Sequence, residues 1–216
     1  HTAYRRKRQR GIRDRPRDKP IRNGRYVYAD AGLNVIKIET DEGITGIGLE
    51  GGVTESEAIG RSIAEYLKQA VVGQDPFDNE RVWDDMWQPK LIGRRGITTR
   101  VISGIDIALW DLKGKYLGQP VYRLAGGPTQ KTMPAYASML GHNVTDMGLV
   151  RERAQQMKER GFRAQKWFFR HGPMSGPDGM RHGVEMVKTL RNAVGDDTDI
   201  MLDAWLSWDY DYAVRM

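Results

Sequence analysis

The sequence predicts a chain of two parts, an α+β domain followed by the first βα units of a domain built on a parallel sheet. Three patterns support this prediction. Apolar and polar residues alternate after residue 25, which is typical of half-buried strands. Segment 97–117 repeats apolar residues at helical spacing. After residue 128, strand and helix patterns alternate three times, which is the order of parallel strands joined by crossover helices.

The strands of the first part precede its helices. Segment 33–40 is β-branched and alternates with period two, Asp41-Glu42-Gly43 is a tight turn, and 44–49 is the returning strand. This is the pattern of an antiparallel hairpin or meander. A short strand-like segment at 26–28 comes before it.

Helices follow at 54–72, 78–87 and 97–117. Thr54 and Glu57 are spaced as a capping box for the first helix. Gly118 and Pro120 end the third helix, and a short helical turn at 121–124 closes this part of the chain.

The second part contains three βα units. Its expected strands and helices lie at 133–139, 145–160, 162–169, 178–194, 199–204 and from about 209 onward. A complete (β/α)8 barrel typically needs about 250 residues. The sequence after residue 128 is far shorter, so we expect a fragment that holds only the first three units.

Charge divides the chain differently. The first 25 residues hold eleven Lys or Arg against two Asp, so the basic pI near 9.5 belongs to them. We therefore expect a basic arm at 1–25, an α+β domain at 26–128 and an incomplete barrel domain at 129–216. The arm is either a solvated, poorly ordered tail or a start that is not the native one. Nucleic-acid binding is the less favoured alternative, since no aromatic interleaving or base-reading motif accompanies the charges.

Composition excludes several classes of protein. The chain has no cysteine, so disulfide scaffolds and thiol chemistry are excluded. It has no apolar run near 18 residues and no signal-peptide core, so we expect no membrane span and a cytoplasmic location.

Three stretches, in order, resemble the mandelate racemase/muconate lactonizing branch of the enolase superfamily. They are 102–115 (ISGIDIALWDLKGK) with 117–127 (LGQPVYRLAGG), 161–166 (GFRAQK) and 194–203 (VGDDTDIMLD). The resemblance implies an α+β capping domain before a truncated TIM-type (β/α)7β barrel. It also implies Mg²⁺, a small carboxylic-acid substrate and homo-oligomers of the full-length parent.

Two residues are the strongest site candidates. Asp203 ends an apolar strand, and a carboxylate at the carboxyl end of a barrel strand faces the site, where its hard oxygens suit Mg²⁺. The resemblance implies that it is the first of three metal ligands. Lys166 matches the first Lys of the family's Lys-x-Lys motif, which lies near the substrate carboxylate. We expect it to stabilise charge there.

The sequence departs from that motif at Phe168, where the family often carries a second Lys as the base. Phenylalanine cannot accept a proton. This departure argues against racemases, epimerases and cycloisomerases and favours dehydratases whose base is a later His, which we expect beyond Met216.

Other features resemble rhamnonate-type acid-sugar dehydratases. Trp205 follows the metal-ligand strand where Asn is often found, and His171 lies in the Arg170-His171-Gly172-Pro173 loop. The resemblance implies that both contact substrate. Arg22 is a further candidate, because an Arg in a cap loop could bind a distal carboxylate or hydroxyl.

The favoured function is Mg²⁺-dependent dehydration of a sugar acid by the full-length parent. The alternatives are another reaction of the same superfamily, a non-enzymatic fragment, or nucleic-acid binding through the basic arm.

Overall fold

The computed structural model describes residues 4–7, 10–52, 57–87 and 95–216. The chain divides into two compact units. The first unit comprises residues 1–16 and 30–131, and the second comprises 17–29 and 132–216. Residues 17–29 therefore belong with the later part of the chain, although they lie far from it in sequence.

An antiparallel sheet with β3 at its centre forms the first unit. Its strands are β1 (Tyr4–Lys7), β2 (Arg10–Arg22), β3 (Val27–Thr40) and β4 (Thr45–Gly52). β3 is hydrogen-bonded to the other three strands, and Val35 lies opposite Leu49 in the β3–β4 pair. Gly43, in the turn between these strands, has φ 83°, a conformation that favours glycine. The predicted hairpin is confirmed.

The basic segment differs from its expected form. Residues 4–7 and 10–22 are strands, whereas the sequence predicted a tail without regular structure. Strand pairing is made by the backbone, so a run of charged side chains does not prevent it. The segment lacks an apolar alternation, which is why the pattern gave no sign of a strand.

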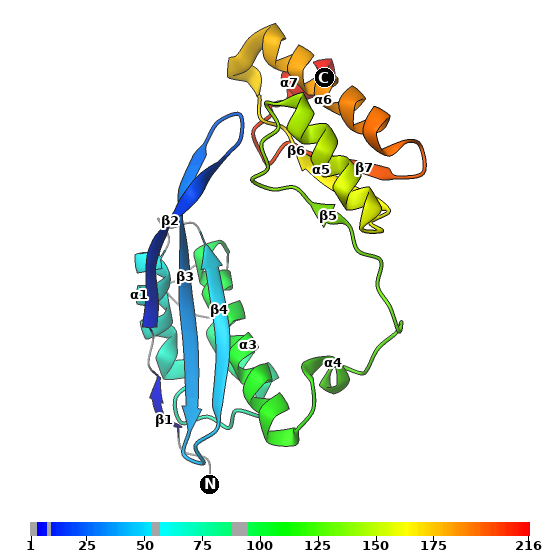
Figure 1. The fold of residues 1–216 in the computed structure, drawn as a ribbon. Helices are drawn as coiled ribbons and strands as arrows, with labels where there is room; N and C mark the ends of the chain where they lie inside the picture. Colours follow the sequence, from blue (N-terminus) through cyan, green and yellow to red (C-terminus); the bar gives the residue numbers. More distant parts are fainter. Residues whose placement is uncertain (1–3, 8–9, 53–56, 88–94) are drawn as a thin grey trace. The chain divides into compact units, whose positions relative to one another are not determined.

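Helices cover one face of this sheet (Figure 1). They are α1 (Glu57–Leu67), the 3-10 turn η2 (Lys68–Ala70), α2 (Asn79–Trp87) and α3 (Ile97–Leu117). The short helix α4 (Val121–Leu124) follows α3 and lies away from the sheet. The bounds predicted for α3 are confirmed, and Gly118 caps it with φ 61°. Thr54 of the expected capping box lies outside the described residues.

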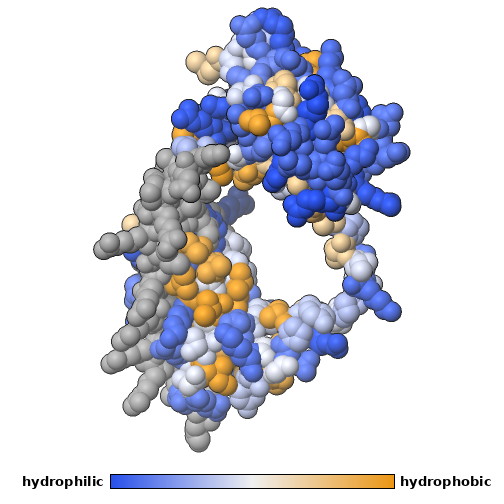
Figure 2. Space-filling model, viewed as in Figure 1, coloured by the Kyte–Doolittle hydropathy of each residue, from blue (hydrophilic) through white to orange (hydrophobic). Residues whose placement is uncertain are grey.

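The core of the first unit lies between β3 and α3. Ile36 and Ile38 from the strand and Ile102, Ile105 and Leu109 from the helix are almost fully buried. Glycines on β4 let α3 approach, because a Cβ at Gly46 or Gly48 would overlap the backbone carbonyl of Ala108 or Gly104. On the opposite face Ile47 and Leu49 are about half exposed, and Figure 2 shows apolar residues gathered over this part of the first unit.

The second unit contains a parallel sheet in the order β5-β6-β7. Its elements are β5 (Ala137–Ser138), α5 (Met147–Glu159), β6 (Ala164–Phe168), the 3-10 turn η3 (Pro173–Ser175), α6 (Gly176–Val194), β7 (Asp199–Asp203) and α7 (Tyr210–Arg215). The predicted βαβαβα order is confirmed. β5 is shorter than expected, and Pro134, which has no N–H to donate, lies in the part that does not pair.

Helices α5 and α6 pack side by side on this sheet (Figure 1). Trp167 from β6 is fully buried with Val150 of α5 and with Met186 and Leu190 of α6. Gln165 is also fully buried, and its amide donates to the Ala154 carbonyl at 2.8 Å while accepting from the Trp167 indole at 3.1 Å. These bonds fix which face of β6 is turned to the helices.

Among the described helices, none combines the length and apolarity needed to cross a membrane.

The close approach of β4 to α3 gives a stability prediction. Gly48→Ala should lower the free energy of unfolding by about 3 kcal/mol, because the new methyl group meets helix backbone that cannot rotate away. The control is Ile47→Ala on the exposed side of the same strand, which should cost under about 1 kcal/mol. Urea unfolding of both variants measures the difference, and equal midpoints would contradict the packing described here.

Candidate active site at the carboxyl ends of the parallel strands

Lys166 and Asp203 meet at the carboxyl ends of two neighbouring strands. In the parallel pair Lys166 lies opposite Met201, and Phe168 lies opposite Asp203. The Lys166 Nζ is 3.6 Å from the Asp203 Oδ2, and the two side chains are 26% and 33% exposed. The two residues expected to form the site are therefore adjacent and open to a small molecule.

The Asp203 carboxylate is oriented by the residue that follows its strand. Its Oδ1 accepts the backbone N–H of Trp205 at 2.7 Å, so Oδ2 is the oxygen turned to Lys166. Trp205 and Leu206 have φ of 44° and 58°, which is uncommon for bulky residues. The Asn23 amide donates to the Trp205 carbonyl at 3.0 Å, so this left-handed turn is held on both sides.

Lys166 is held as a cation. A hydrogen bond with the Tyr136 hydroxyl is the main cause that raises the pKa of Lys166; burial opposes it, and the Asp203 carboxylate adds a smaller upward effect. Its Nζ lies 5.3 Å from the Tyr136 ring centre and 5.1 Å from that of Phe168. These surroundings suit charge stabilisation and oppose a role as a proton acceptor.

Aromatic rings line the same site. Trp205 stacks on Tyr28 with ring centres 4.5 Å apart, and its edge-to-face contact with Phe168 is at 6.5 Å. The structure thus places Trp205 beside Phe168 and Asp203, and its contact with substrate stays a prediction. Tyr28 and Tyr136 were missed, because their roles depend on contacts between distant segments.

The turn between β2 and β3 is locked by a buried asparagine. The Asn23 Oδ1 accepts the N–H groups of Arg25 and Tyr26 at 2.8 and 2.7 Å. The backbone passes close to the loop after β6 at Gly24, where a Cβ would overlap Gly172.

This turn also binds the loop after β7. The Arg25 Nε donates to the Ser207 carbonyl at 3.1 Å, and the Arg25 guanidinium is 3.9 Å from the Asp209 carboxylate. Ser207 is fully buried. Residues early and late in the sequence therefore meet beside the turn that carries Trp205.

Arg22 lies in a pocket beside this site. The pocket holds about 530 Å³, and its walls include Phe168 and Arg170. The Arg170 guanidinium donates to the Asn23 carbonyl at 3.4 Å. Arg170 stood in a motif that the sequence singled out, but its side chain was not chosen as a candidate.

His171 is placed against α6. Its ring contacts the ring of His182 at 4.6 Å, its Nδ1 is 3.3 Å from the Ser175 Oγ, and its carbonyl accepts the Trp208 indole at 2.9 Å. Within the part of the chain that the structure describes, no contact joins this ring to Lys166 or Asp203. Substrate contact by His171 therefore stays a prediction.

The residues at this site fit a hard cation in part. Asp203 offers one carboxylate oxygen, and Mg²⁺ binds through one or two carboxylates with water and substrate oxygens. Over residues 4–7, 10–52, 57–87 and 95–216, no cluster of three or more metal-binding side chains is found. Asp203 alone would hold such an ion weakly.

The fold and the site define a class of protein, an α+β cap followed by parallel βα units that carry charged residues at their strand ends. Comparison with known families gives the particular one. Residues 9–126 match the "Mandelate racemase / muconate lactonizing enzyme, N-terminal domain" family, and 149–216 match "Enolase C-terminal domain-like". The first match alone covers more than half of the chain. The chain belongs to the mandelate racemase/muconate lactonizing enzyme family of the enolase superfamily.

Individual proteins agree with this family. The chain is 33% identical over 186 residues to an L-rhamnonate dehydratase of Saccharopolyspora erythraea, covering 86% of this chain and 44% of that protein. A racemase from Streptomyces coelicolor with bound magnesium has a TM-score of 0.85 at 29% identity, covering 98% of this chain and 58% of that one.

A third similar protein was solved with a ligand. It is an L-talarate dehydratase from Polaromonas sp. JS666 complexed with Mg and L-glucarate. Its TM-score is 0.83 at 26% identity, covering 100% of this chain and 57% of that one. The chain thus spans about half the length of these proteins.

The surroundings of His171 predict a pH effect on stability. Burial lowers the pKa of His171, and the charges of His182 and Arg170 lower it further. The unfolded chain therefore binds more protons near and below pH 6.5, so this stabilisation is complete above that pH and is lost as the pH falls through the folded pKa.

His171→Asn should accordingly reduce the fall in melting temperature between about pH 7.5 and about pH 5. Asn keeps a group that can hydrogen-bond Ser175 but has no proton to gain. Thermal unfolding of the wild type and the variant at both pH values tests this. An unchanged pH dependence would exclude His171 as its source.

Proposed function

We propose that this chain forms part of a Mg²⁺-dependent hydro-lyase that removes water from a sugar acid. The observation that carries the proposal is the pair formed by Lys166 and Asp203 at adjacent strand ends, 3.6 Å apart and open to solvent. The names of the similar dehydratases from Saccharopolyspora and Polaromonas support the reaction class.

In this proposal Lys166 and Asp203 bind the carboxylate end of the substrate from two sides. Asp203 would supply one oxygen ligand to Mg²⁺, and the bound ion would stabilise negative charge on the substrate carboxylate. Lys166 stabilises the same charge by its ammonium group, whose pKa is raised. The hydrogen bond from Trp205 to Asp203 keeps the liganding oxygen in place.

The overall reaction breaks two bonds of the substrate. A base takes the proton on the carbon next to the carboxylate, the electron pair forms a carbon–carbon double bond, and the β-hydroxyl leaves with a proton as water. The resulting enol becomes a 2-keto-3-deoxy acid. Since Lys166 is held as a cation and Phe168 cannot accept a proton, we assign the base to a residue outside the described part of the chain.

Phe168 is also the reason to prefer dehydration to racemisation. A racemase must remove and return a proton on opposite faces of one carbon, so it needs a group on each face. The Phe168 ring lies beside Lys166 where such a group would stand. This supports acid–base chemistry from one face only.

The role of the charged pair can be tested in the full-length gene product. Asp203→Asn should weaken Mg²⁺ binding and abolish measurable dehydration. Lys166→Met should lower kcat by roughly 10²- to 10³-fold, because an electrostatic contact to the developing charge is lost. Turnover of a panel of aldonic and aldaric acids, with calorimetry for Mg²⁺, provides the readouts.

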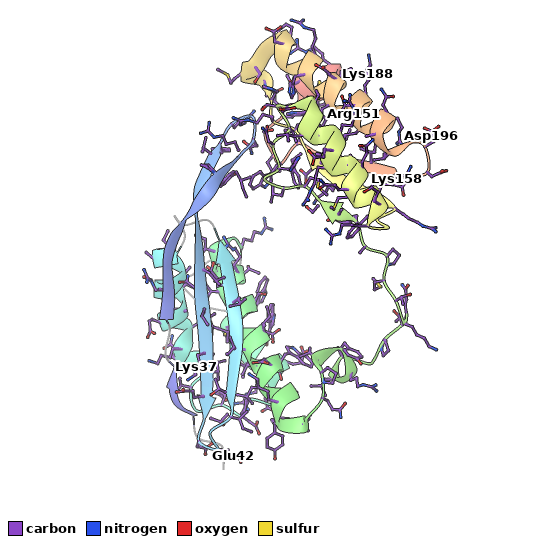
Figure 3. The ribbon with its side chains drawn as sticks, viewed as in Figure 1. Lys37, Glu42, Arg151, Lys158, Lys188 and Asp196 are labelled. Atoms are coloured by element: carbon purple, nitrogen blue, oxygen red, sulfur yellow. The ribbon has the colours of Figure 1, made fainter. Side chains whose placement is uncertain are left out.

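Matched controls lie on α6 and in the turn before β7, where Figure 3 labels Lys188 and Asp196. Both side chains belong to exposed residues, so Lys188→Met and Asp196→Asn should retain full activity. Loss of activity in the controls, or retention of it in Asp203→Asn, would contradict the proposal. Solvent deuterium entering the substrate without loss of water would indicate a racemase.

A second prediction concerns the 216-residue chain by itself. We expect no turnover from it, because Asp203 alone cannot form a strong Mg²⁺ site and because the base is assigned to a later residue of the full-length parent. A rate that stays with the purified chain and disappears in Asp203→Asn would show that this expectation is wrong.

A further inference from the structure

Two arginines share the pocket beside Lys166 and Asp203. Arg22 stands at the end of β2, Arg170 follows β6, and both line the pocket of about 530 Å³. We infer that Arg22 and Arg170 bind a second acidic group at the far end of the substrate, so that the substrate is a sugar diacid. This inference rests on the proposed function and names the class of its substrate.

The charges of these two residues are not balanced within the described chain. Among the residues that the structure describes, no carboxylate forms an ion pair with Arg22 or Arg170. Burial lowers the pKa of Arg170, and the positive charge of Arg22 lowers it further. Like charges placed close together are unfavourable, and an anion between them would relieve the repulsion.

Arg170 also has hydrogen-bonding capacity to spare. Among the described residues its guanidinium donates to the Asn23 carbonyl, at the long distance of 3.4 Å, while a guanidinium carries five N–H donors in a planar fork. That fork matches the two oxygens of a carboxylate. Arg22 is exposed, and its side chain makes no hydrogen bond within the described residues.

The pocket has a mixed lining. Ile21, Leu140, Leu149 and Phe168 contribute apolar surface, and His142, Asn143 and Thr145 contribute polar groups. Apolar surface beside a guanidinium strengthens its attraction to a carboxylate.

The pocket adjoins the reacting end of the proposed site. The Phe168 ring that lines the pocket also contacts the Lys166 ammonium, at 5.1 Å from the ring centre. Lys166, Phe168 and Arg170 alternate along one side of β6 and its continuation. Residues four apart on a strand are about 13 Å apart, a span that two long side chains and a six-carbon diacid between them can fill.

The alternative substrate class is a sugar monoacid such as L-rhamnonate. Its far end is uncharged and would leave both guanidinium groups unpaired. A protein with these two arginines is therefore expected to prefer sugar diacids to sugar monoacids.

The test compares matched pairs of acids that differ only in the terminal group, such as galactarate with galactonate. In the full-length protein kcat/KM should favour the diacid. Arg170→Met and Arg22→Met should each lower kcat/KM for the diacid by about 10- to 100-fold, mainly through KM, because a charged hydrogen bond is lost. Turnover of the monoacid should change by less than about threefold.

Controls separate binding from folding. Arg151 is exposed on α5, where Figure 3 labels it, and Arg151→Met should leave both substrates unaffected. Arg170→Lys keeps the charge and should restore part of the diacid preference. The Arg22 side chain makes no hydrogen bond in the described chain, so Arg22→Met tests the inference even if Arg170→Met fails to fold.

Calorimetric binding of galactarate without Mg²⁺ provides a readout independent of turnover. Dehydration of monoacids only, unchanged in both variants, would overturn the subsite and leave the proposed function standing. Galactarate binding that depends on Arg170, without any dehydration of the panel, would support the subsite and overturn the proposed function.

Discussion

The parallel pairing of β6 with β7 is the constraint on which the candidate site depends. Because Phe168 lies opposite Asp203, Lys166 is placed where its ammonium group reaches the carboxylate. If the register of β6 shifted by one residue, the strand would turn its other face to the helices, which would bury Lys166 and expose Trp167. The buried hydrogen bonds of Gln165 to Ala154 and Trp167 oppose such a change, since they would leave polar groups unsatisfied in the core. The core of the second unit thereby determines the geometry of its surface.

The electrostatic character of this site follows from residues that come together only in the folded chain. Arg22 and Arg170 line one pocket, and Phe168 of its lining contacts Lys166, which is paired with Asp203. A partly enclosed excess of positive charge concentrates small anions and orients them by their charged ends. The basic run near the start of the sequence contributes to this through Arg22. Part of the positive charge of residues 1–25 therefore lies in the second unit, which the pI of the whole chain does not reveal.

Short sequence patterns, such as apolar repeats and family motifs, predicted the elements and candidate residues that do not depend on distant partners. The bounds of α3 followed from its apolar repeat and from Gly118, Asp203 followed from its place at a strand end, and Lys166 followed from the family resemblance. The strand at 10–22 was missed because its pairing is made by the backbone, and its run of charged side chains lacks the apolar alternation by which a strand is recognised. Asn23 and Tyr136 were missed for another reason. Each acts through a partner far away in sequence, and no short pattern reports such a contact.

The left-handed turn at Trp205 and Leu206 gives the site a particular mechanical property. A bulky residue in this region costs on the order of 1–3 kcal/mol, so the turn persists only while its neighbours outweigh that cost. One of those neighbours is Asn23, which is 182 positions earlier in the chain. The conformation of this turn therefore depends on a hydrogen bond from a segment far away in the sequence. If cleavage of the chain near Asn23 removed this hydrogen bond, Trp205 would relax to a more common backbone conformation. The Asp203 carboxylate would then lose the Trp205 N–H that orients it, although the strand that carries Asp203 would be unchanged.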